Sequence, residues 1–377
     1  MRMLDAVARA YGADRLIPAA SAHIGLSLSS LGEAGVAMLE AFADEGVRFA
    51  IPTTTNVLSS GREDADAAGL QMRALDAVTR MGAIDNCSCN PFSQGHVPRF
   101  GQSVAWSESA TAPYLNSVLG ARTNREGATA LATALTGLTP NYGMHLDAER
   151  RAGALFRVTA SLHDLHRHHL LAAAVCRRDP VGIPAMIGFA VVPGQDALLG
   201  FSAALATYSN LAMFHMVGIT PEAATLEAIY PDGTPDEVVI GDAELEAELV
   251  RMRMCETAEA KVVVIGCPHA SLGQLREISM LMAGERVRPD CSLIVHTNRD
   301  VMQAAAVGGL LAALRSGGVQ LSADTCIYVG LDSYPAGTAL VTDSAKMAFL
   351  MATRGLRTAV ASTRECVRSA LGQPIRA

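Results

Sequence analysis

Apolar and polar positions in the first quarter of the chain follow two alternating patterns, one helical and one strand-like. Amphipathic stretches at 31–47 and 65–83 have the spacing of helices. Each is expected to lead into a short strand, VRFAIP (47–52) after the first and a segment ending at NCSCNP (86–91) after the second. The pattern predicts strand–helix winding from the start of the chain.

The same winding returns in the last third of the chain. Continuous apolar runs at 261–268, 291–299 and 319–326 are typical of strands buried on both faces of a parallel sheet. Helical patterns lie between them, over 271–284 and 302–318. Together the two regions predict a wound α/β fold.

The longest apolar stretch, at 183–206, is interrupted by Pro184, Pro193, Gln195 and Asp196. These breaks predict a buried strand, a turn and a buried helix. No uninterrupted apolar run of about 18 residues occurs, so a membrane span is not expected.

Length and charge narrow the class of protein further. A chain of 377 residues is too long for one ordinary core and predicts two or three α/β subdomains within one catalytic domain over 1–377, with the acidic stretch at 230–246 as a candidate boundary. The net charge is −7 and no block of Lys or Arg occurs, which excludes a nucleic-acid backbone as partner. The N-terminus has no export signal, so we expect a cytoplasmic protein.

Unusual residues follow the strand-like runs, at the positions where wound sheets bind their ligands. The segments concerned are PTTTN (52–56), CSCNPF (87–92), GCPHAS (266–271), HTNR (296–299) and DTC (324–326). Three of these five segments contain cysteine, which points to one shared site.

Cysteine at a single strand end is most often a small packing residue. Three of them in separate turns, Cys89, Cys267 and Cys326, fit converging ligands better. The pattern around Cys87 leaves its role open, and the remaining cysteines are predicted to pack: Cys176, Cys255, Cys291 and Cys366.

Three thiolates are one fewer than a closed metal site requires, and catalytic centres leave such a position open. Sulfur ligands favour an iron–sulfur cluster, zinc or Cu(I). An open iron beside a carboxylate clamp is suited to removing water from a hydroxy acid.

Two arginines three residues apart, Arg122 and Arg125, have the spacing of an anion clamp. The alternative is a surface pair bound to Glu126 or to aspartates. Glu108 is either a desolvated acid, a partner of an arginine, or a carboxylate at a helix start. The run HDLHRHH at 163–169 has helical metal-ligand spacing but no accompanying zinc motif, and it predicts a solvated polar helix face.

The motifs resemble, in order, the large-subunit domain of the aconitase X family. Besides the five segments above, the resemblance is carried by SAHIGLS (21–27), AWSES (105–109), NSVLGARTNREG (116–127), YGMHLD (142–147) and TDSAK (342–346). It covers nearly the whole chain, and its most specific parts are ARTNR, GCPHAS and the three cysteines.

This resemblance implies an aconitase-like fold of three wound α/β units around an iron–sulfur cluster held by Cys89, Cys267 and Cys326. Family members are hydro-lyases. They dehydrate either cis-3-hydroxy-L-proline to a pyrroline carboxylate, mostly with a [2Fe–2S] centre, or mevalonate 5-phosphate with a [4Fe–4S] centre. The first activity and a [2Fe–2S] cluster are favoured here.

The resemblance also implies a partner, because the family's small swivelling domain, whose serine serves as the base, has no counterpart in this chain. We therefore expect a separate small subunit. The catalytic residues are predicted to be Glu108, His145, His269 and Lys346. The residues predicted to bind the hydroxy acid are Ser21, His23, Thr54, Asn56, Asn116, Arg122, Asn124 and Arg125.

Two functions of other classes remain open from the sequence. One is a zinc enzyme that uses the same three cysteines and a bound water. The other is a non-catalytic scaffold subunit, although such a protein has no physical need for converging polar groups.

Overall fold

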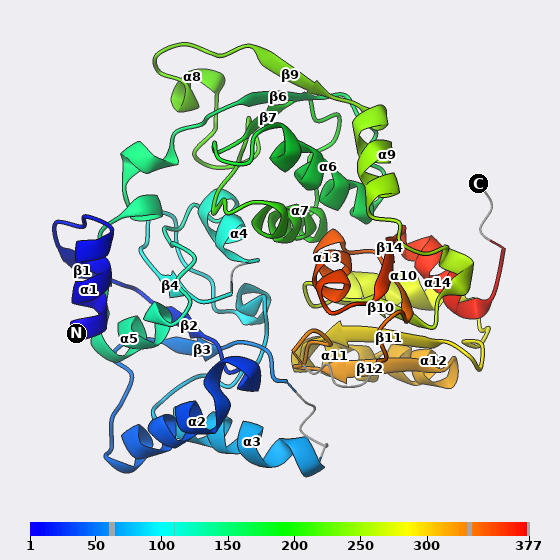
Figure 1. Cartoon of the computed structure of the whole chain (residues 1–377), viewed down its shortest axis with the longest axis horizontal. Coiled ribbons are helices and arrows are strands. Elements are labelled where there is room, and N and C mark those ends of the chain that lie inside the picture. Colours follow the sequence, from blue (N-terminus) through cyan, green and yellow to red (C-terminus); the bar gives the residue numbers. More distant parts are fainter. Residues whose placement is uncertain (60–64, 109, 330–333, 375–377) are drawn as a thin grey trace.

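Parallel sheets wound by helices form three successive units, shown in the computed structural model of Figure 1, which describes residues 1–59, 65–108, 110–329 and 334–374. The first unit is blue to cyan, the second green and the third yellow to red. This arrangement confirms the predicted α/β fold. Within the described residues, no helix has the length and apolar character needed to cross a membrane.

The first unit is built on a parallel sheet in the order β3-β2-β4. A two-stranded antiparallel ribbon, β1 with β5, lies beside it. The elements are α1 (Arg2–Ala10), β1 (Leu16–Pro18), β2 (Ala22–Ile24), α2 (Leu28–Asp44), β3 (Thr53–Thr55), α3 (Ala65–Arg80), η1 (Pro91–Gln94), β4 (Ala105–Trp106), α4 (Ala112–Ser117), α5 (Thr129–Thr136), β5 (Leu138–Pro140), η2 (Gly143–His145) and η3 (Asp147–Arg150).

Two strand predictions for this unit were wrong. VRFAIP is not a strand, because its backbone bonds to separate segments, from Phe49 N–H to Met81 O and from Ala50 N–H to Ala134 O. The strand is the threonine run that follows, which pairs with β2. The second expected strand is reduced to an isolated bridge at Ile84.

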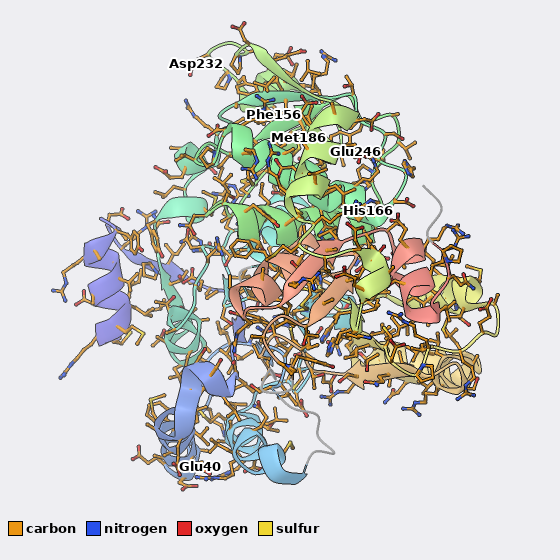
Figure 2. The ribbon with its side chains drawn as sticks, turned by 45° about the vertical axis from the view of Figure 1, so that its right-hand side comes forward. Glu40, Phe156, His166, Met186, Asp232 and Glu246 are labelled. Atoms are coloured by element: carbon orange, nitrogen blue, oxygen red, sulfur yellow. The ribbon has the colours of Figure 1, made fainter. Side chains whose placement is uncertain are left out.

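The second unit has the parallel sheet order β8-β7-β6-β9. Phe156 and Met186 lie buried inside it, while Asp232 and Glu246 lie at its outside (Figure 2). The elements are β6 (Leu155–Val158), α6 (Leu165–Arg178), β7 (Ala185–Ile187), α7 (Gln195–Tyr208), β8 (His215–Met216), α8 (Leu226–Ile229), β9 (Glu237–Ile240) and α9 (Asp242–Arg251).

The histidine-rich start of α6 corrects a prediction. His166, His168 and His169 are buried rather than solvated, because α6 is covered by α7 and α9. Arg167 is buried with them and forms ion pairs with Asp242 and Glu246. The stretch 230–246 lies inside this unit, since β9 pairs with β6, and the chain passes to the third sheet only after α9.

The third unit has the parallel order β12-β11-β10-β13-β14. Its apolar strands match the predicted runs, but the helix expected over 302–318 is divided at Gly308 and Gly309. The elements are η4 (Thr257–Glu259), β10 (Val262–Ile265), α10 (Leu272–Met282), β11 (Ser292–Thr297), α11 (Arg299–Val307), α12 (Leu310–Ser316), β12 (Val319–Ala323), β13 (Ala339–Thr342), α13 (Ala345–Thr353), β14 (Arg357–Val360) and α14 (Thr363–Leu371).

The order of this sheet reverses between β10 and β13, and ligands of wound sheets bind outside the strand ends at such a reversal. Cys267 follows β10, and Lys346 lies at the start of α13, directly beyond β13. The core around α6 and α7 also includes Trp106 from the first unit and Ala345 from the third. The three units therefore pack around the region where these residues meet.

Candidate active site

A largely buried ion pair between Lys346 and Glu108 lies at the centre of the site. Lys346 Nζ is 2.9 Å from Glu108 Oε1, and the two side chains are only 15% and 13% exposed. Asn56, directly after β3, donates from Nδ2 to Glu108 Oε2 at 2.8 Å, and the Ala110 N–H donates to Oε1 at 3.1 Å. The carboxylate is thus held from three directions.

Both groups of this pair are charged at neutral pH. Burial raises the pKa of Glu108, but the charge and hydrogen bond of Lys346 and the hydrogen bond from Asn56 outweigh it and lower the pKa to about 2. Burial lowers the pKa of Lys346, whereas Glu108 and the neighbouring thiols raise it above its ordinary value. The site therefore contains a charged ammonium group that is largely shielded from water.

All three predicted cysteines lie within electrostatic range of this pair. Burial is the main cause that raises the pKa of Cys89, Cys267 and Cys326, to about 12 for Cys267. Glu108 raises and Lys346 lowers the pKa of every one of these thiols, and Cys267 interacts with both of the others. Among the residues described, no group of three His, Cys, Asp or Glu side chains is arranged to hold a metal ion as it stands.

The other cysteines behave largely as expected. Cys176, Cys255 and Cys366 are buried in apolar cores, and Cys291 packs at the edge of one. Cys87 is buried beside Asp85 and Thr55, with its Sγ 3.1 Å from Asp85 Oδ1.

His269 connects the three cysteine-bearing turns. Its backbone N–H donates to Cys89 Sγ at 3.3 Å, and its ring nitrogens contact Ser88 Oγ at 3.2 Å and the Thr325 carbonyl at 2.9 Å. Burial lowers the pKa of this imidazole, so the ring is neutral. Because both ring nitrogens have protein partners, the geometry favours a positioning role over the predicted proton transfer.

One glycine is required for this arrangement. Gly266 has φ +99°, and a Cβ there would lie 2.0 Å from the His296 carbonyl oxygen. The close approach of β10 and β11 at this point fixes the direction in which Cys267 leaves the sheet.

His23 and Thr54 lie on neighbouring strands of the first sheet, and Ser21 directly precedes β2. His23 Nδ1 is 2.9 Å from Thr54 Oγ1, and Ser21 Oγ accepts a hydrogen bond from Trp106 Nε1 at 3.4 Å. Burial lowers the pKa of His23 to about 3 although Glu108 opposes the shift. The imidazole is therefore neutral at physiological pH.

The two predicted clamp arginines have different surroundings. Arg125 Nη1 donates to Asn210 Oδ1 at 3.0 Å. Burial lowers the pKa of Arg125, and the charge of Glu108 raises it. Arg125 therefore lies within electrostatic range of Glu108. Arg122 forms an ion pair with Asp147 and donates to the His145 carbonyl at 2.9 Å. Of the two arginines, Arg125 is therefore the one within electrostatic range of Glu108.

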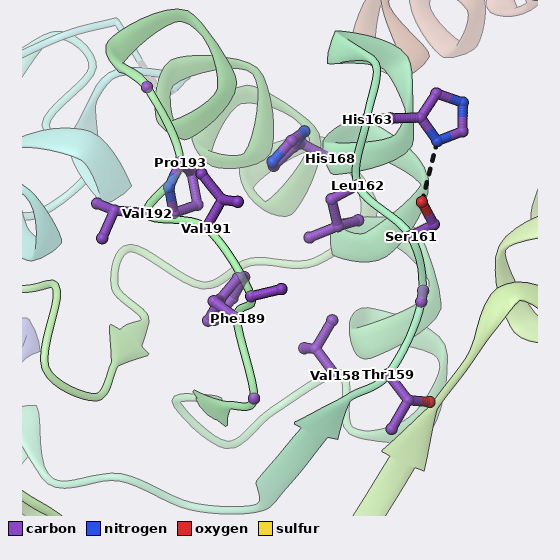
Figure 3. Close-up of a pocket in the computed structure, with 14 residues that line it drawn as sticks. Val158, Thr159, Ser161, Leu162, His163, His168, Phe189, Val191, Val192 and Pro193 are labelled. Atoms are coloured by element: carbon purple, nitrogen blue, oxygen red, sulfur yellow. Dashed lines mark hydrogen bonds between the residues drawn. The ribbon is translucent and has the colours of Figure 1, made fainter.

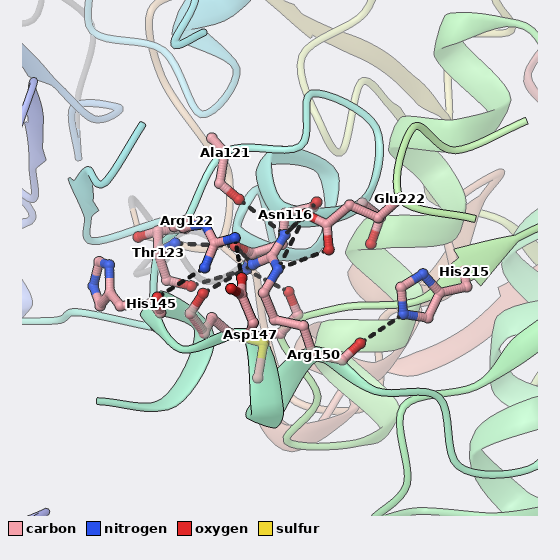
Figure 4. A network of polar contacts seen from close by, with 12 residues as sticks. Asn116, Ala121, Arg122, Thr123, His145, Asp147, Arg150, His215 and Glu222 are labelled. Carbon is pink, nitrogen blue, oxygen red and sulfur yellow. Dashed lines mark hydrogen bonds and ion pairs between the residues drawn. The ribbon is translucent and has the colours of Figure 1, made fainter. Parts of the chain in front are cut away.

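The side chains of Asn116 and Asn124 bond within the protein, and His145 does so through Nδ1, while its buried Nε2 has no hydrogen-bond partner among the described residues. The Asn116 amide bonds to the backbone at both ends, and its Oδ1 also accepts from Arg150 at 3.0 Å (Figure 4). Asn124 bonds to the backbone of residues 142 and 144, and His145 Nδ1 lies 3.1 Å from Ser103 Oγ. These side chains shape the loop that carries the arginines.

Sequence reasoning missed two residues with important contacts. Arg150 is buried, pairs with Glu222 at 2.5 Å and holds the backbone around Asn116, but a lone arginine carries no recognisable pattern. Ser344 caps α13 by accepting from Met347 N–H at 3.2 Å, and it lowers the pKa of Cys267. A serine at the start of a predicted helix indicates an N-cap, so the capping role of Ser344 could have been predicted from the sequence.

A separate hollow of about 390 Å³ lies in the second unit, between the loops after β6 and β7 (Figure 3). His163 and His168 line it, with His163 Nδ1 3.1 Å from Ser161 Oγ. None of the predicted site residues faces this hollow.

Comparison with known proteins agrees with the geometry. Family models described as the first, second and third domains of aconitase X match residues 1–148, 152–249 and 260–372. A solved structure of Thermococcus kodakaraensis aconitase X in its holo-form has a TM-score of 0.88 at 30% identity, over 98% of this chain and 94% of that one.

Relatives fall under two names. The phosphomevalonate dehydratase large subunit of Methanothermobacter thermautotrophicus is 33% identical over 92% of this chain and 88% of its own. The cis-3-hydroxy-L-proline dehydratase of Pseudomonas aeruginosa is also 33% identical, over 99% of this chain but 66% of its own length. With these matches along nearly its whole length, the chain belongs to the aconitase X family, whose named relatives are dehydratases.

Proposed function

We propose that this chain is the large subunit of an iron–sulfur hydro-lyase that removes water from a small hydroxy acid. The favoured substrate is cis-3-hydroxy-L-proline, and mevalonate 5-phosphate is the alternative, since relatives of equal identity bear either name. The observation that carries the proposal is the largely buried Glu108–Lys346 pair with three thiols within electrostatic range of it.

The cysteines fit a cluster in their donor chemistry. They present sulfur only, from three separate turns, and leave a position for substrate. The raised pKa values keep these thiols protonated, so a cationic centre is needed to bind them as thiolates. Held there, a [2Fe–2S] or [4Fe–4S] cluster supplies Lewis acidity towards the leaving hydroxyl.

The chain's own residues orient the substrate. Arg125 offers a planar guanidinium for the carboxylate, and Lys346 places a permanent positive charge beside the reacting carbons. Glu108 and Asn56 fix the direction of the Lys346 ammonium group. His23, being neutral, contributes a hydrogen bond without adding charge.

The base that removes the proton is proposed to come from a partner. Relatives that match most of this chain are named large subunits, and the Pseudomonas protein extends well beyond the matched length. We infer that a separate small subunit covers the site, excludes water and supplies a serine.

The test is anaerobic loading of the chain with iron and sulfide, followed by dehydration assays on both substrates with and without the candidate small subunit. We expect turnover of cis-3-hydroxy-L-proline only by the pair. Full activity of the isolated chain would reject the partner requirement. A colourless, zinc-containing active enzyme would replace the cluster with the zinc alternative.

A further inference from the structure

A cavity of about 480 Å³ lies in the first unit, between α2 and α5 and next to the carboxyl end of β2. Its wall is mainly aliphatic and is formed by side chains such as Leu26, Leu31, Met38, Leu39 and Leu131. Small-molecule sites typically combine such an apolar wall with a few polar groups.

The polar edge of this cavity is shared with the candidate active site. Asn56 lines the cavity and donates from Nδ2 to Glu108 Oε2 at 2.8 Å. Ser107, the residue before Glu108, also lines it, and its buried Oγ has no hydrogen-bond partner in the described part of the chain. A ligand at the Glu108–Lys346 pair therefore has this cavity beside it.

The lining carries no charge. Among the residues that the structure describes, no Asp, Glu, Lys, Arg or His side chain lines the cavity. Gly127 and Ala128 place the start of α5 at its edge, but a helix N-terminus offers only about half a positive charge. A phosphate buried here would lose its water without gaining a charged partner, which is costly.

We propose that this cavity holds the uncharged, hydrocarbon part of the hydroxy acid, while the carboxylate and hydroxyl lie at Arg125 and the Glu108–Lys346 pair. The proposal rests on the proposed function and names its substrate class: hydroxy acids with an uncharged tail, rather than phosphorylated ones. In cis-3-hydroxy-L-proline, the ring methylene groups are the part that faces the cavity.

Binding can be measured without turnover, because Trp106 is the chain's only tryptophan and directly precedes Ser107. Fluorescence titrations of the cluster-loaded chain would compare cis-3-hydroxy-L-proline, mevalonate and mevalonate 5-phosphate. The last two differ only in the phosphate. We expect cis-3-hydroxy-L-proline to bind and mevalonate to bind at least as tightly as its phosphate.

A matched pair of variants tests the location. Gly25 lines the cavity, and a Cβ there would meet Ser107 Oγ at an ordinary 3.6 Å, so Gly25→Leu introduces a side chain at the shared edge. It should weaken binding by about tenfold or more. Gly69→Leu on α3, where a Cβ meets no atom within 4 Å, should leave binding within about twofold of wild type.

Wild-type affinity in Gly25→Leu would overturn the proposal, and so would binding of mevalonate 5-phosphate at least about tenfold more tightly than mevalonate. If Gly25→Leu does not fold, the comparison of the two mevalonates on the wild-type chain decides alone. Binding that Gly25→Leu blocks, without dehydration by the reconstituted pair, would reject the proposed reaction and keep the cavity assignment.

Discussion

Replacing Lys346 by methionine should destabilise the protein, because it leaves the Glu108 carboxylate buried without its cation. In the wild type the pKa of Glu108 lies at about 2 instead of 4.5, even though burial alone would raise it. At about 1.4 kcal/mol per pKa unit, that difference is on the order of 3 kcal/mol at neutral pH. Loss of one partner from a buried pair costs about 3–5 kcal/mol, which is the same magnitude.

The sign of the pH dependence follows from the direction of the shift. Since the folded-state pKa is lowered, the stabilisation is complete above about pH 4.5 and is lost as the pH falls towards 2. Without Lys346, burial is expected to raise the pKa of Glu108 above its ordinary value. As the pH falls from about 7 to about 5, the variant should therefore become more stable. The stability of the wild type does not depend on this group in that range.

Urea unfolding of the metal-free protein at these two pH values measures both effects. The chain's other lysine, Lys261, is a matched control, because its pair with Asp290 is more than half exposed at both ends and Lys261→Met should cost at most about 1 kcal/mol. The double variant Lys346→Met/Glu108→Gln should recover most of the loss. Equal unfolding free energies for Lys346→Met and Lys261→Met at neutral pH would refute the reasoning.

Three further predictions concern the surroundings of the ion pair. Serine at any of the three site cysteines should abolish the visible absorption of the loaded protein, whereas Cys176→Ser should not; a retained spectrum would contradict sulfur ligation. Arg125→Lys should lower kcat/KM at least about tenfold, because an ammonium lacks the guanidinium fork, while Arg122→Lys should act mainly on stability. The reverse ranking would move the carboxylate clamp to Arg122. Gly266→Ala should cost about 3 kcal/mol in unfolding free energy through its positive φ and the overlap with the His296 carbonyl, so an unchanged thermal midpoint would show that the turn can relax.

The sequence predicts those parts of the fold that depend on local pattern. Val262–Ile265 is a continuous apolar run because a central parallel strand is covered on both faces, and this signal needs no knowledge of its neighbours. VRFAIP is also largely apolar, but within the described residues it pairs with no strand, since the N–H groups of Phe49 and Ala50 donate to two different segments. The burial of His166 and His169 depends on α7 and α9, which the helix sequence alone does not reveal.

The candidate site likewise has features that the sequence predicts and features that depend on residues distant in the chain. The electrostatic interaction between Cys267 and Cys326 is predictable, because both follow strands of one parallel sheet, whose ends meet at one edge. The position of Cys89 is not, because it belongs to the first unit and reaches the third only through the contacts of His269. The separation of Arg122 from Arg125 is not, because it depends on Asp147, which lies 25 residues further along the chain. The role of Arg150 cannot be predicted from the sequence for a similar reason, since its partner Glu222 comes from another unit.

The contacts of His269 have a thermodynamic consequence. This residue belongs to the third unit, yet it bonds to Ser88, Cys89 and Asn90 of the first. Cys89 consequently comes within electrostatic range of Cys267 only when these two units are docked, so any ligand that binds all three thiols would also favour docking, by mass action. A bound metal centre would thus stabilise the contact between the first and third units, which are far apart in sequence. Its removal should expose the junction between these units to proteases.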